Sequence, residues 1–549
     1  GSTEYLYDDK AVASFTTAPG YKVELFASEK EFPHLANPVQ LSFDNQGRLW
    51  IATMPSYPHY KPGDAKPSDK LLILEDTDND GKADKETVFA EGLHLPTGFE
   101  IAHNGVYVAQ GNHLIFLQDT DGDDKADVQE IVLSGFDDHD THHVISAFCA
   151  DPSGAIYMGE GTFLHSHVET AYGPVRSSNG GFFRYSPQRN RMERTSRISI
   201  PNPWGTAFDE YGQPFFLETS DPSLLWMTPC NVNVDYGQFT PKPPSIVEGE
   251  HRIRPTSGLE IVSSRHFPEE VQGDLLVSNT IGYLGIKQHQ VLDSEAGFQA
   301  KHRLDLITSK DGNYRPVDLE FAPDGSLFIV DWHNVLVGHM QHSARDPLRD
   351  HKHGRIYRIT YPERPLVKPA QIHKAPLATL FENLTLPESR TRYRTRRELR
   401  GRDASEVLSA LKAWTATQRD ERVLLEALWV TWGLDQVDAD LLKKLLDAKD
   451  HRVRAAAIEV LRHSDHQISG QAELLKKTAT DKSARVRLQT AAAASWLNPS
   501  QGLRVLKAVE TQPIDSWIKP VLATAKSQLE GKRSEEHTSE LQPPCNIVC

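Results

Sequence analysis

The sequence predicts an all-β six-bladed β-propeller followed by an α-helical HEAT-like repeat domain. Three observations support this fold class. One strand-turn-strand unit recurs six times, Pro362, Pro365 and Pro369 then interrupt the chain, and helix-forming residues dominate the remainder. We therefore expect the propeller at residues 15–365, a linker at 366–376, helical repeats at 377–532 and a non-native tail at 533–549.

The repeated unit is an apolar strand, a turn with Asn, Asp or Gly, and a second apolar strand, as in LSFDNQGRLWIAT. The unit at Gly273 is the least clear. The six units begin at Leu41, Phe99, Ala147, Ala207, Gly273 and Leu319. A spacing of about 45 to 70 residues is what propeller blades with loop insertions produce. A β-sandwich would not repeat one hairpin six times.

Apolar residues at helical spacing begin near Leu377. The segments DHRVRAAAIEVLRH, from Asp450, and KSARVRLQTAAAASWL, from Lys482, match with a period of about 33 residues. Weaker copies occur at Arg394 and Leu424. This period is typical of stacked helix pairs, so we interpret the region as a packing or docking scaffold without chemistry.

The composition is that of an ordinary globular protein with more than one domain. Of 549 residues, 38% are hydrophobic and 25% are charged, and the formal net charge is -15. This balance argues against a nucleic-acid partner, because a phosphate-binding surface needs clustered Lys and Arg. No apolar run approaches the roughly 18 residues needed to span a bilayer, so we expect no transmembrane segment.

Both ends of the sequence resemble non-native additions. The first three residues, GST, resemble an expression scar, which would hide a removed signal peptide. The segment RSEEHTSELQ resembles a translated sequencing-adapter read-through, so we expect that an incomplete gene ends near Lys532 and that the natural protein continues further. Two of the four cysteines fall in that tail and none forms a CxxC, so the cysteines define no framework.

Two acidic segments, residues 76–84 and 119–127, place carboxylates at positions 1, 3, 5 and 9 of a loop. Calcium takes six to eight oxygen ligands, and alternating Asp residues turn their carboxylates toward one centre. Only the second segment also has an acidic residue where an EF-hand carries Glu, which makes it the stronger candidate. The predicted ligands of structural calcium are Asp76, Asp78, Asp80 and Asp84, and Asp119, Asp121, Asp123, Asp127 and Glu130.

A long loop between two predicted strands, residues 331–353, is rich in titratable groups and poor in apolar ones. Loops of this length in a compact domain are usually functional or disordered. Two interpretations stay open. The loop histidines could bind zinc or another divalent ion with nearby carboxylates, or the loop could be a salt-bridged plug that closes the propeller. The residues concerned are His333, His339, His342, His351, Asp331 and Asp350.

A second histidine group, residues 137–143, precedes the strand of the third repeat. Adjacent residues of a strand point to opposite faces, so His142 and His143 cannot both face the propeller axis unless the strand is bulged. We expect one of them to do so. Neutral imidazole can serve as a base or as a metal ligand, and the sequence leaves both roles open.

Six motifs together resemble the PVC-type membrane-bound dehydrogenase family. They are DTHHVISAF, HSHVETAYGPVR, NPWGTAFDEYGQ, SSRHFPEEVQGDLLVSNTIGYLGIK, YRPVDLEFAPDGSLFIVDWHN and GHMQHSARDPLRDHKHGRIYRITY, and they cover residues 20–365. That family commonly joins the propeller to HEAT-like repeats and a c-type cytochrome module with CxxCH. This chain has no CxxCH, so we expect no covalent haem in it. The resemblance implies a periplasmic or extracellular, membrane-associated protein.

More distantly, the propeller is similar to the soluble quinoprotein sugar dehydrogenases, which bind pyrroloquinoline quinone (PQQ) and calcium at the centre of six blades. This resemblance implies that His142 or His143 takes the proton of a substrate hydroxyl. Asn202 matches a cofactor-binding Asn of that family, and Arg315 matches the first of two cofactor-binding arginines.

Two cationic groups of the quinoprotein pattern are missing. Pro201 stands in place of the Arg before Asn202, and Val317 replaces the second arginine. Their loss would weaken the hold on a tricarboxylate such as PQQ, because Arg forms bidentate charge-assisted hydrogen bonds.

Two functions follow as hypotheses. The first is an oxidoreductase that oxidises a sugar or polyol and passes electrons to a c-type cytochrome. The second is a non-redox metal-dependent or glycan-binding propeller with a docking scaffold, in which Trp204, Trp226 and Trp332 could stack on a sugar ring. The candidate catalytic residues are His142, His143, Arg315, Asp331 and His333, and the candidate cofactor-binding residues are Asn202, Arg315, His339 and His342.

Overall fold

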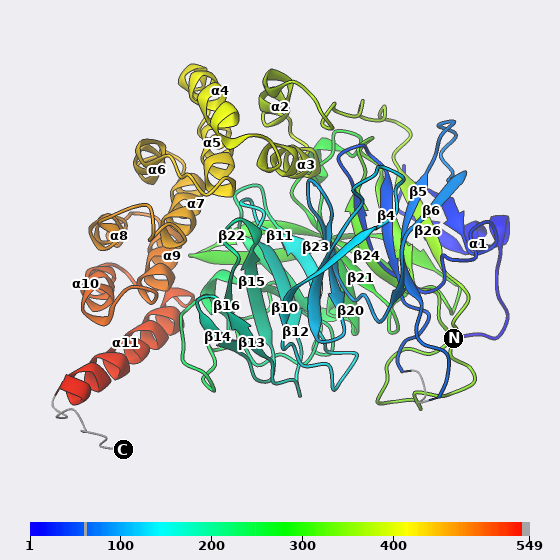
Figure 1. Cartoon of the computed structure of the whole chain (residues 1–549), viewed down its shortest axis with the longest axis horizontal. Helices are drawn as coiled ribbons and strands as arrows, with labels where there is room; N and C mark the ends of the chain where they lie inside the picture. Colours follow the sequence, from blue (N-terminus) through cyan, green and yellow to red (C-terminus); the bar gives the residue numbers. More distant parts are fainter. Residues whose placement is uncertain (60–62, 248, 541–549) are drawn as a thin grey trace.

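The computed structural model describes residues 1–59, 63–247 and 249–540, and side chains as far as residue 532. Six antiparallel sheets surround an axis as the blades of a β-propeller, and the later helices lie along one side of it (Figure 1). This confirms the predicted propeller with a helical region after it. The last part of the expected tail, residues 541–549, lies outside the described residues.

Each blade is a sheet of three to five strands. The first comprises β3 (Pro38–Phe43), β4 (Leu49–Thr53), β5 (Asp69–Glu75) and β6 (Lys85–Leu93), and the second β7 (Phe99–Ile101), β8 (Val106–Gln110), β9 (His113–Gln118) and β10 (Val128–Ser134). The third comprises β11 (Ser146–Ala150), β12 (Ile156–Glu160), β15 (Gly181–Ser186) and β16 (Arg191–Ser196), and the fourth β17 (Pro203–Phe208), β18 (Pro214–Glu218) and β19 (Ser223–Trp226).

The fifth blade comprises β20 (Thr256–Ile261), β21 (Leu275–Asn279), β22 (Gly285–Ser294) and β23 (Gly297–Ser309), and β1 (Phe15–Thr17) adds to its edge. The sixth comprises β24 (Pro316–Phe321), β25 (Leu327–Asp331), β26 (Arg355–Thr360) and β2 (Lys22–Ser28). A separate hairpin is formed by β13 (His167–Thr170) and β14 (Gly173–Arg176).

The ring is closed by the start of the chain. β2 precedes the first blade in sequence but pairs antiparallel with β26, from Lys22 opposite Thr360 to Ser28 opposite Arg355. The first strands of successive blades contact one another around the axis. The second strands β4, β12, β18, β21 and β25 are buried along their whole length, because blades cover both of their faces. This explains their continuous apolar sequences.

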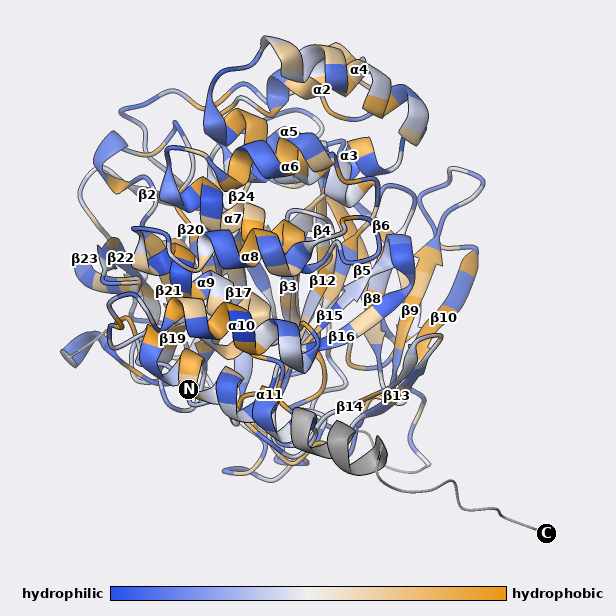
Figure 2. Cartoon of the chain, turned by 90° about the vertical axis from the view of Figure 1, so that its left-hand side faces the viewer, coloured by the Kyte–Doolittle hydropathy of each residue, from blue (hydrophilic) through white to orange (hydrophobic). Residues whose placement is uncertain are grey.

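The helices after the propeller form two layers (Figure 1). The layer against the propeller contains α3 (Ser389–Arg400), α5 (Glu421–Gly433), α7 (His451–Arg462), α9 (Ala484–Ala494) and α11 (Ile518–Glu540). The outer layer contains α2 (Leu377–Asn383), α4 (Ala404–Thr417), α6 (Ala439–Leu446), α8 (Gln471–Thr478) and α10 (Pro499–Val509), and Figure 2 shows α6, α8 and α10 in front of the strands.

Aspartates cap several of these helices. Asp403, Asp420, Asp438 and Asp450 each accept a hydrogen bond from a backbone N–H of the first turn of α4, α5, α6 and α7. One short helix, α1 (Asp8–Ala13), precedes the propeller. Among the described residues, no helix is both long and apolar enough to cross a membrane.

The helices and the propeller share one apolar core. Phe215 and Trp226 of the fourth blade and Phe298 of the fifth lie in the same buried cluster as residues of α5, α7 and α9. Arg485 of α9 lies over the Phe298 ring at 3.8 Å and donates to the Gly297 carbonyl oxygen (2.6 Å). The helices are therefore packed tightly against the fourth and fifth blades.

Candidate functional site

A cavity of about 290 Å³ occupies one end of the propeller axis. It lies where the first strand of each blade begins and the second strand ends, so every blade contributes to it. Its wall combines the aromatic rings of Tyr57, Trp204 and Trp332 with hydroxyl side chains. The hydroxyl groups belong to Thr97, Thr141, Thr219, Ser220, Thr256, Ser257 and Thr280.

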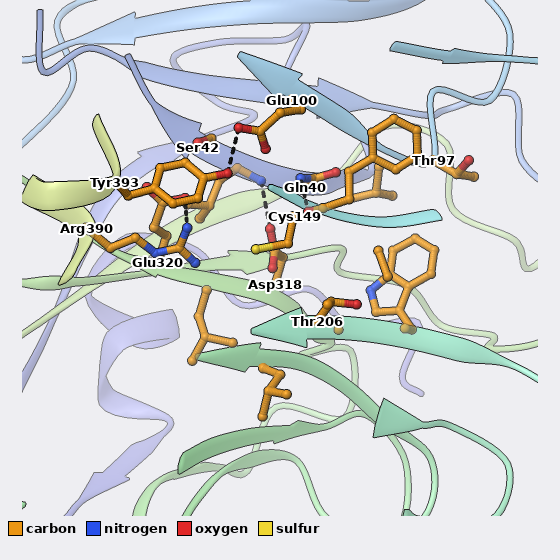
Figure 3. A pocket seen from close by; sticks show the side chains of 18 residues that line it. Gln40, Ser42, Thr97, Glu100, Cys149, Thr206, Asp318, Glu320, Arg390 and Tyr393 are labelled. Atoms are coloured by element: carbon orange, nitrogen blue, oxygen red, sulfur yellow. Dashed lines mark hydrogen bonds and ion pairs between the residues drawn. The ribbon is translucent and has the colours of Figure 1, made fainter. Parts of the chain in front are cut away.

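A second, smaller cavity of about 40 Å³ lies further along the axis (Figure 3). Val39, Thr97 and Trp204 line both cavities, and the Trp204 indole N–H donates to the Val317 carbonyl oxygen (2.9 Å). Trp204 therefore forms part of the partition between them. Asp318 lines the smaller cavity, where burial raises its pKa to about 7.

Helix α3 covers the far side of the smaller cavity. Arg390 donates to Glu260 (2.8 Å), Arg394 donates to Glu320 (3.0 Å), and the Tyr393 hydroxyl donates to Glu100 (2.6 Å; Figure 3). These three glutamates belong to the innermost strands β20, β24 and β7. α3 thus closes one end of the axis with cations placed over carboxylates.

His142 faces the larger cavity, and both of its ring nitrogens are engaged. Asn202 Nδ2 donates to Nε2 (3.1 Å), which places the imidazole proton on Nδ1, and Nδ1 contacts the Tyr57 hydroxyl (2.5 Å). Asn202 and Tyr57 also line the cavity. The structure therefore joins two residues that the sequence singled out, His142 and Asn202, with one it did not, Tyr57.

An aspartate beneath His142 holds two further histidines. Asp140 contacts His339 Nε2 (3.0 Å) and His143 Nδ1 (3.3 Å), and the His339 ring stacks on His142 with centroids 4.4 Å apart. Burial alone would raise the pKa of Asp140, but its hydrogen bonds with His143 and His339 lower it strongly. Asp140 is therefore an anion fixed behind the cavity wall.

The environment of His142 keeps its imidazole neutral. Burial, followed by the nearby His339 and His143, lowers its pKa to about 3. His143 instead turns Nδ1 toward the Thr162 carbonyl oxygen (3.1 Å) and does not line the cavity. Of the two adjacent histidines, His142 is the one that reaches the axial cavity.

Three predicted catalytic residues lie away from the cavity wall. Arg315 uses its guanidinium on the carbonyl oxygens of Asn334 (3.0 Å) and Thr280 (2.9 Å). Asp331 accepts from the backbone N–H of Arg315 (2.8 Å) and lies 3.0 Å from His333 Nδ1. None of Arg315, Asp331 and His333 is among the residues that line the cavity. Their contacts hold the start of the long histidine loop.

The loop histidines do not converge on one centre. His339 contacts Asp140, His351 Nδ1 contacts the Pro55 carbonyl oxygen (2.7 Å), and His353 Nδ1 contacts Asp350 (2.6 Å). Among the described residues, no group of candidate metal ligands comes from this loop. The interpretation as a zinc site is therefore not supported by the geometry.

The loop instead covers part of the cavity. Arg349 donates to the carbonyl oxygens of Gly338 (2.8 Å), His342 (3.1 Å) and Ser343 (2.9 Å), which folds the loop around one guanidinium. Gly338, Gln341 and His342 then line the larger cavity. The loop therefore covers part of the cavity, as the plug interpretation expects, and His342 joins Asn202 as a predicted cofactor residue that lines it.

The two acidic segments form equivalent hairpin loops on the outside of the propeller. One oxygen from each of Asp76, Asp78 and Asp84 lies within 4.8 Å of the others, and Asp119, Asp121 and Asp127 repeat this grouping. Asp80, Asp123 and Glu130 are not in these groups. Asp80 and Asp123 cap the backbone N–H of the residue two positions later, and Glu130 is exposed on β10.

Each acidic loop also joins neighbouring blades. The Ala83 N–H donates to the Phe26 carbonyl oxygen of β2 (2.8 Å), and the Ala126 N–H donates to the Phe89 carbonyl oxygen of β6 (2.8 Å). A cation held by either loop would thus stabilise contacts between blades.

The larger cavity does not suit PQQ. A tricarboxylate needs several cationic partners, but Arg254 is the one Lys or Arg among the described residues that line the cavity. Arg315 is committed to carbonyl oxygens, and Val317 is part of the apolar wall. The losses at Pro201 and Val317 are therefore not compensated by other cations.

Sequence reasoning missed α3 as the closure of the axis. The segment SRTRYRTRRELR carries many arginines and a single glutamate within the helix, so its arginines needed acidic partners elsewhere. This excess of arginine over glutamate indicates that the helix packs against acidic residues. A second signal is that Glu100, Glu260 and Glu320 each lie in an apolar strand, where a carboxylate needs a partner.

The comparison with family models identifies a family for this chain. A family model described as "Domain of unknown function (DUF7133)" matches residues 8–363. No curated protein matches the chain. Among solved structures, a luciferin-regenerating enzyme is 13% identical with a TM-score of 0.40, covering 62% of this chain and 95% of its own.

Two further solved structures are similar at the same level. A calcium-binding protein, regucalcin, from Agrobacterium tumefaciens is 15% identical with a TM-score of 0.37, covering 62% of this chain and 94% of its own. A glucose dehydrogenase is 13% identical with a TM-score of 0.38, covering 61% of this chain and 99% of its own. At these values the likenesses carry no inference about ligand or activity.

Proposed function

The chain belongs to the family described as Domain of unknown function (DUF7133), and from this premise we propose that its axial cavity binds a neutral sugar or polyol. The observation that supports this proposal is the composition of the wall, which combines three aromatic rings, seven Ser and Thr hydroxyls and the neutral imidazole of His142. Every blade contributes to that wall.

The chemistry of the wall matches a polyhydroxylated ligand. Aromatic faces pack against the C–H faces of sugars, and Ser and Thr hydroxyls can both donate to and accept from ligand hydroxyls. Trp204 and Trp332 provide such faces, as two of the three predicted stacking tryptophans. Trp226 does not, because it is fully buried in the core of the fourth blade. Among the described residues of the wall, Arg254 is the one Lys or Arg, which makes the site suited to a neutral ligand.

The environment of His142 favours binding over proton abstraction. A general base works best when its pKa lies near the working pH, whereas the pKa of His142 is about 3. A neutral imidazole between Tyr57 and Asn202 is well placed to exchange one of these hydrogen bonds for a ligand hydroxyl. This supports recognition as the primary role of the site.

The test is a binding titration of the full chain with a panel of sugars and polyols. Calorimetry and tryptophan fluorescence measure the binding. We expect saturable binding that changes the emission of Trp204 and Trp332. His142→Ala should weaken it about fivefold, since a lost hydrogen bond is worth about 1 kcal/mol. His167→Ala, on the exposed hairpin strand β13, is the control and should bind normally. Absence of binding across the panel would contradict the proposal.

The pH dependence of binding distinguishes His142 from an ordinary histidine. An exposed histidine becomes cationic below pH ~6.5, whereas His142 stays neutral until the pH approaches 3. We therefore expect the affinity to be constant from pH 8 to pH 5. The groups around His142 are His339, His143, Asp140, Tyr57 and Arg349. A tenfold loss of affinity centred near pH 6.5 would show that His142 titrates normally.

A second candidate is oxidation of the same sugar or polyol, with electrons passed to a c-type cytochrome. The hydrogen-bonded chain from Tyr57 through His142 to Asn202 favours it, because such a chain can accept a hydroxyl proton. Dye reduction in the presence of PQQ and calcium, lost in His142→Ala, would favour oxidation. Binding without dye reduction would favour recognition alone.

We also infer that the two acidic loops bind calcium in a structural role. The donors are carboxylate oxygens from three aspartates in each loop, which suits a hard cation. At 100 times its dissociation constant, calcium bound at one site would raise the free energy of unfolding by about 2.7 kcal/mol.

Thermal unfolding with calcium or with a chelator tests this inference. Calcium should raise the melting temperature of the unmodified chain, because each loop joins two blades. The double variant Asp76→Asn, Asp119→Asn should lose that increase. Asp465→Asn, at an exposed position in the helical region, should keep it. Equal melting temperatures with and without calcium would rule the role out.

A further inference from the structure

A histidine cluster lies on the outer part of the fifth blade, apart from the axial wall. His289 of β22 and His302 of β23 are directly opposite each other, and Lys287 and Asp305 form a neighbouring cross-strand pair. A short 3-10 helix, η3 (Gly249–His251), brings a third histidine against this hairpin. Side chains of opposite residues in antiparallel strands lie close enough to share a ligand.

The side chains converge at short range. The rings of His251 and His302 are stacked with centroids 3.6 Å apart and an interplanar angle of 16°, so one ring has to turn before both nitrogens can bind the same ion. One nitrogen from each of these histidines and one oxygen of Asp305 lie within 4.8 Å of one another. The His289 ring lies 5.3 Å from that of His302 and 6.4 Å from that of His251. Three imidazoles and one carboxylate thus share a small volume.

Two nitrogens in this cluster have no protein partner. Nδ1 of His289 and Nδ1 of His302 are buried and make no hydrogen bond within the described part of the chain. The His289 side chain is only 1% exposed. A buried polar atom without a partner costs about 1–3 kcal/mol, so such atoms usually mark an ion, a water or a functional role.

A lysine competes with the ion for the carboxylate of this cluster. Lys287 donates to Asp305 Oδ1 (2.8 Å) and would have to share that carboxylate with the ion.

We propose that His251, His302 and Asp305, with His289 beside them, form a binding site for a divalent transition-metal ion such as zinc. Imidazole nitrogen with one carboxylate is the donor set that zinc, nickel and copper prefer, whereas calcium prefers oxygen alone. The site is distinct in chemistry from the two acidic loops.

The ion would fix the rim of the axial cavity. Arg254 and Pro255, a few residues after His251, line that cavity. Their carbonyl oxygens accept from the backbone N–H groups of Gly282 (3.2 Å) and Thr280 (3.3 Å) in the loop between β21 and β22. A metal bound to His251 would hold the segment that carries Arg254. The site itself does not depend on which ligand the cavity takes.

Calorimetric titration of the metal-stripped full chain with zinc chloride tests the proposal. Excess calcium is kept in the buffer so that the acidic loops are not available to zinc. We expect one equivalent of zinc to bind to the unmodified chain. His251→Ala and His302→Ala should each weaken binding on the order of 100-fold, because a direct ligand costs at least as much as a residue that orients one.

The matched control is His34→Ala, which removes another histidine paired with a carboxylate, Glu86, on the first blade. It should bind zinc as the unmodified chain does. Cobalt in place of zinc adds a second readout, since ligation by nitrogen gives visible absorption that the His302 variant should lose. The His251 side chain is 29% exposed, so its removal should leave the hairpin folded, which thermal unfolding checks.

Two results would overturn the proposal. One is no zinc binding to the folded, metal-stripped chain. The other is unchanged stoichiometry and affinity in both His251→Ala and His302→Ala, which would place the bound ion elsewhere.

Discussion

Glu320→Ala is expected to lower the free energy of unfolding by about 3–5 kcal/mol, because it leaves the buried Arg394 without its anion. Glu320 Oε1 accepts from Arg394 (3.0 Å), and Oε2 lies 3.6 Å from Arg390. The side chains of Glu320, Arg394 and Arg390 are all largely buried. Burial alone would raise the pKa of Glu320, but the arginines lower it, so this carboxylate is an anion that the helix requires.

Chemical denaturation measures this change. Asp221→Ala is the matched control, because Asp221 also contacts two cations, Lys242 (2.6 Å) and Arg252 (2.7 Å), but is half exposed. That variant should lower the free energy of unfolding by no more than about 1 kcal/mol. Equal, small effects of the two substitutions would mean that α3 is held by its apolar contacts rather than by its charges.

The second large effect is expected for Trp204→Ala, which removes part of the partition between the two axial cavities. Replacing a packed Trp by Ala costs about 3 kcal/mol or more, and here it would also join a 290 Å³ cavity to a 40 Å³ one. Sugar affinity should fall with it, because one of the aromatic faces is lost. Calorimetry measures the loss of sugar affinity, and chemical denaturation measures the loss of stability.

Trp204→Phe provides the comparison for this variant. It keeps an aromatic face in the partition but loses the hydrogen bond to the Val317 carbonyl oxygen. We expect most of the sugar affinity to remain. If Trp204→Phe and Trp204→Ala bind equally weakly, the indole N–H rather than the ring surface would be the important contact.

The propeller was predictable because its signal is local and repeated. Leu41 and Leu319 begin units in which two strands and their turn are contiguous, and the buried second strands require unbroken apolar sequences. The fifth blade was the least clear, because its innermost strand β20 (Thr256–Ile261) lies before the unit that the sequence suggested at Gly273.

The candidate site was predictable only in part. His142 and Asn202 came from a resemblance, and the structure joins them at 3.1 Å. Tyr57 and the hydroxyl wall could not be found in the same way, since the hydroxyl residues are scattered over the second to fifth blades. Arg315 occupies the position that the resemblance indicates, but its guanidinium points to carbonyl oxygens. The direction of a side chain cannot be read from the sequence.

Contacts between distant segments explain the remaining differences. The arginines of α3 meet glutamates of three different blades, and three strands separate His251 from His302 in the sequence. Neither arrangement has a fixed spacing in the sequence. Only the excess of cations in α3 and the isolated carboxylates in apolar strands indicated that such partners existed.

The pairing of β2 with β26 has a consequence for synthesis on the ribosome. β2 ends at Ser28, and its partner begins only at Arg355, so the strand emerges long before the strand that will cover its edge. An uncovered edge strand is prone to pair with other chains. The nascent polypeptide must therefore delay closure of the ring until the sixth blade is complete, and crowded or slowed translation should favour aggregation at that stage.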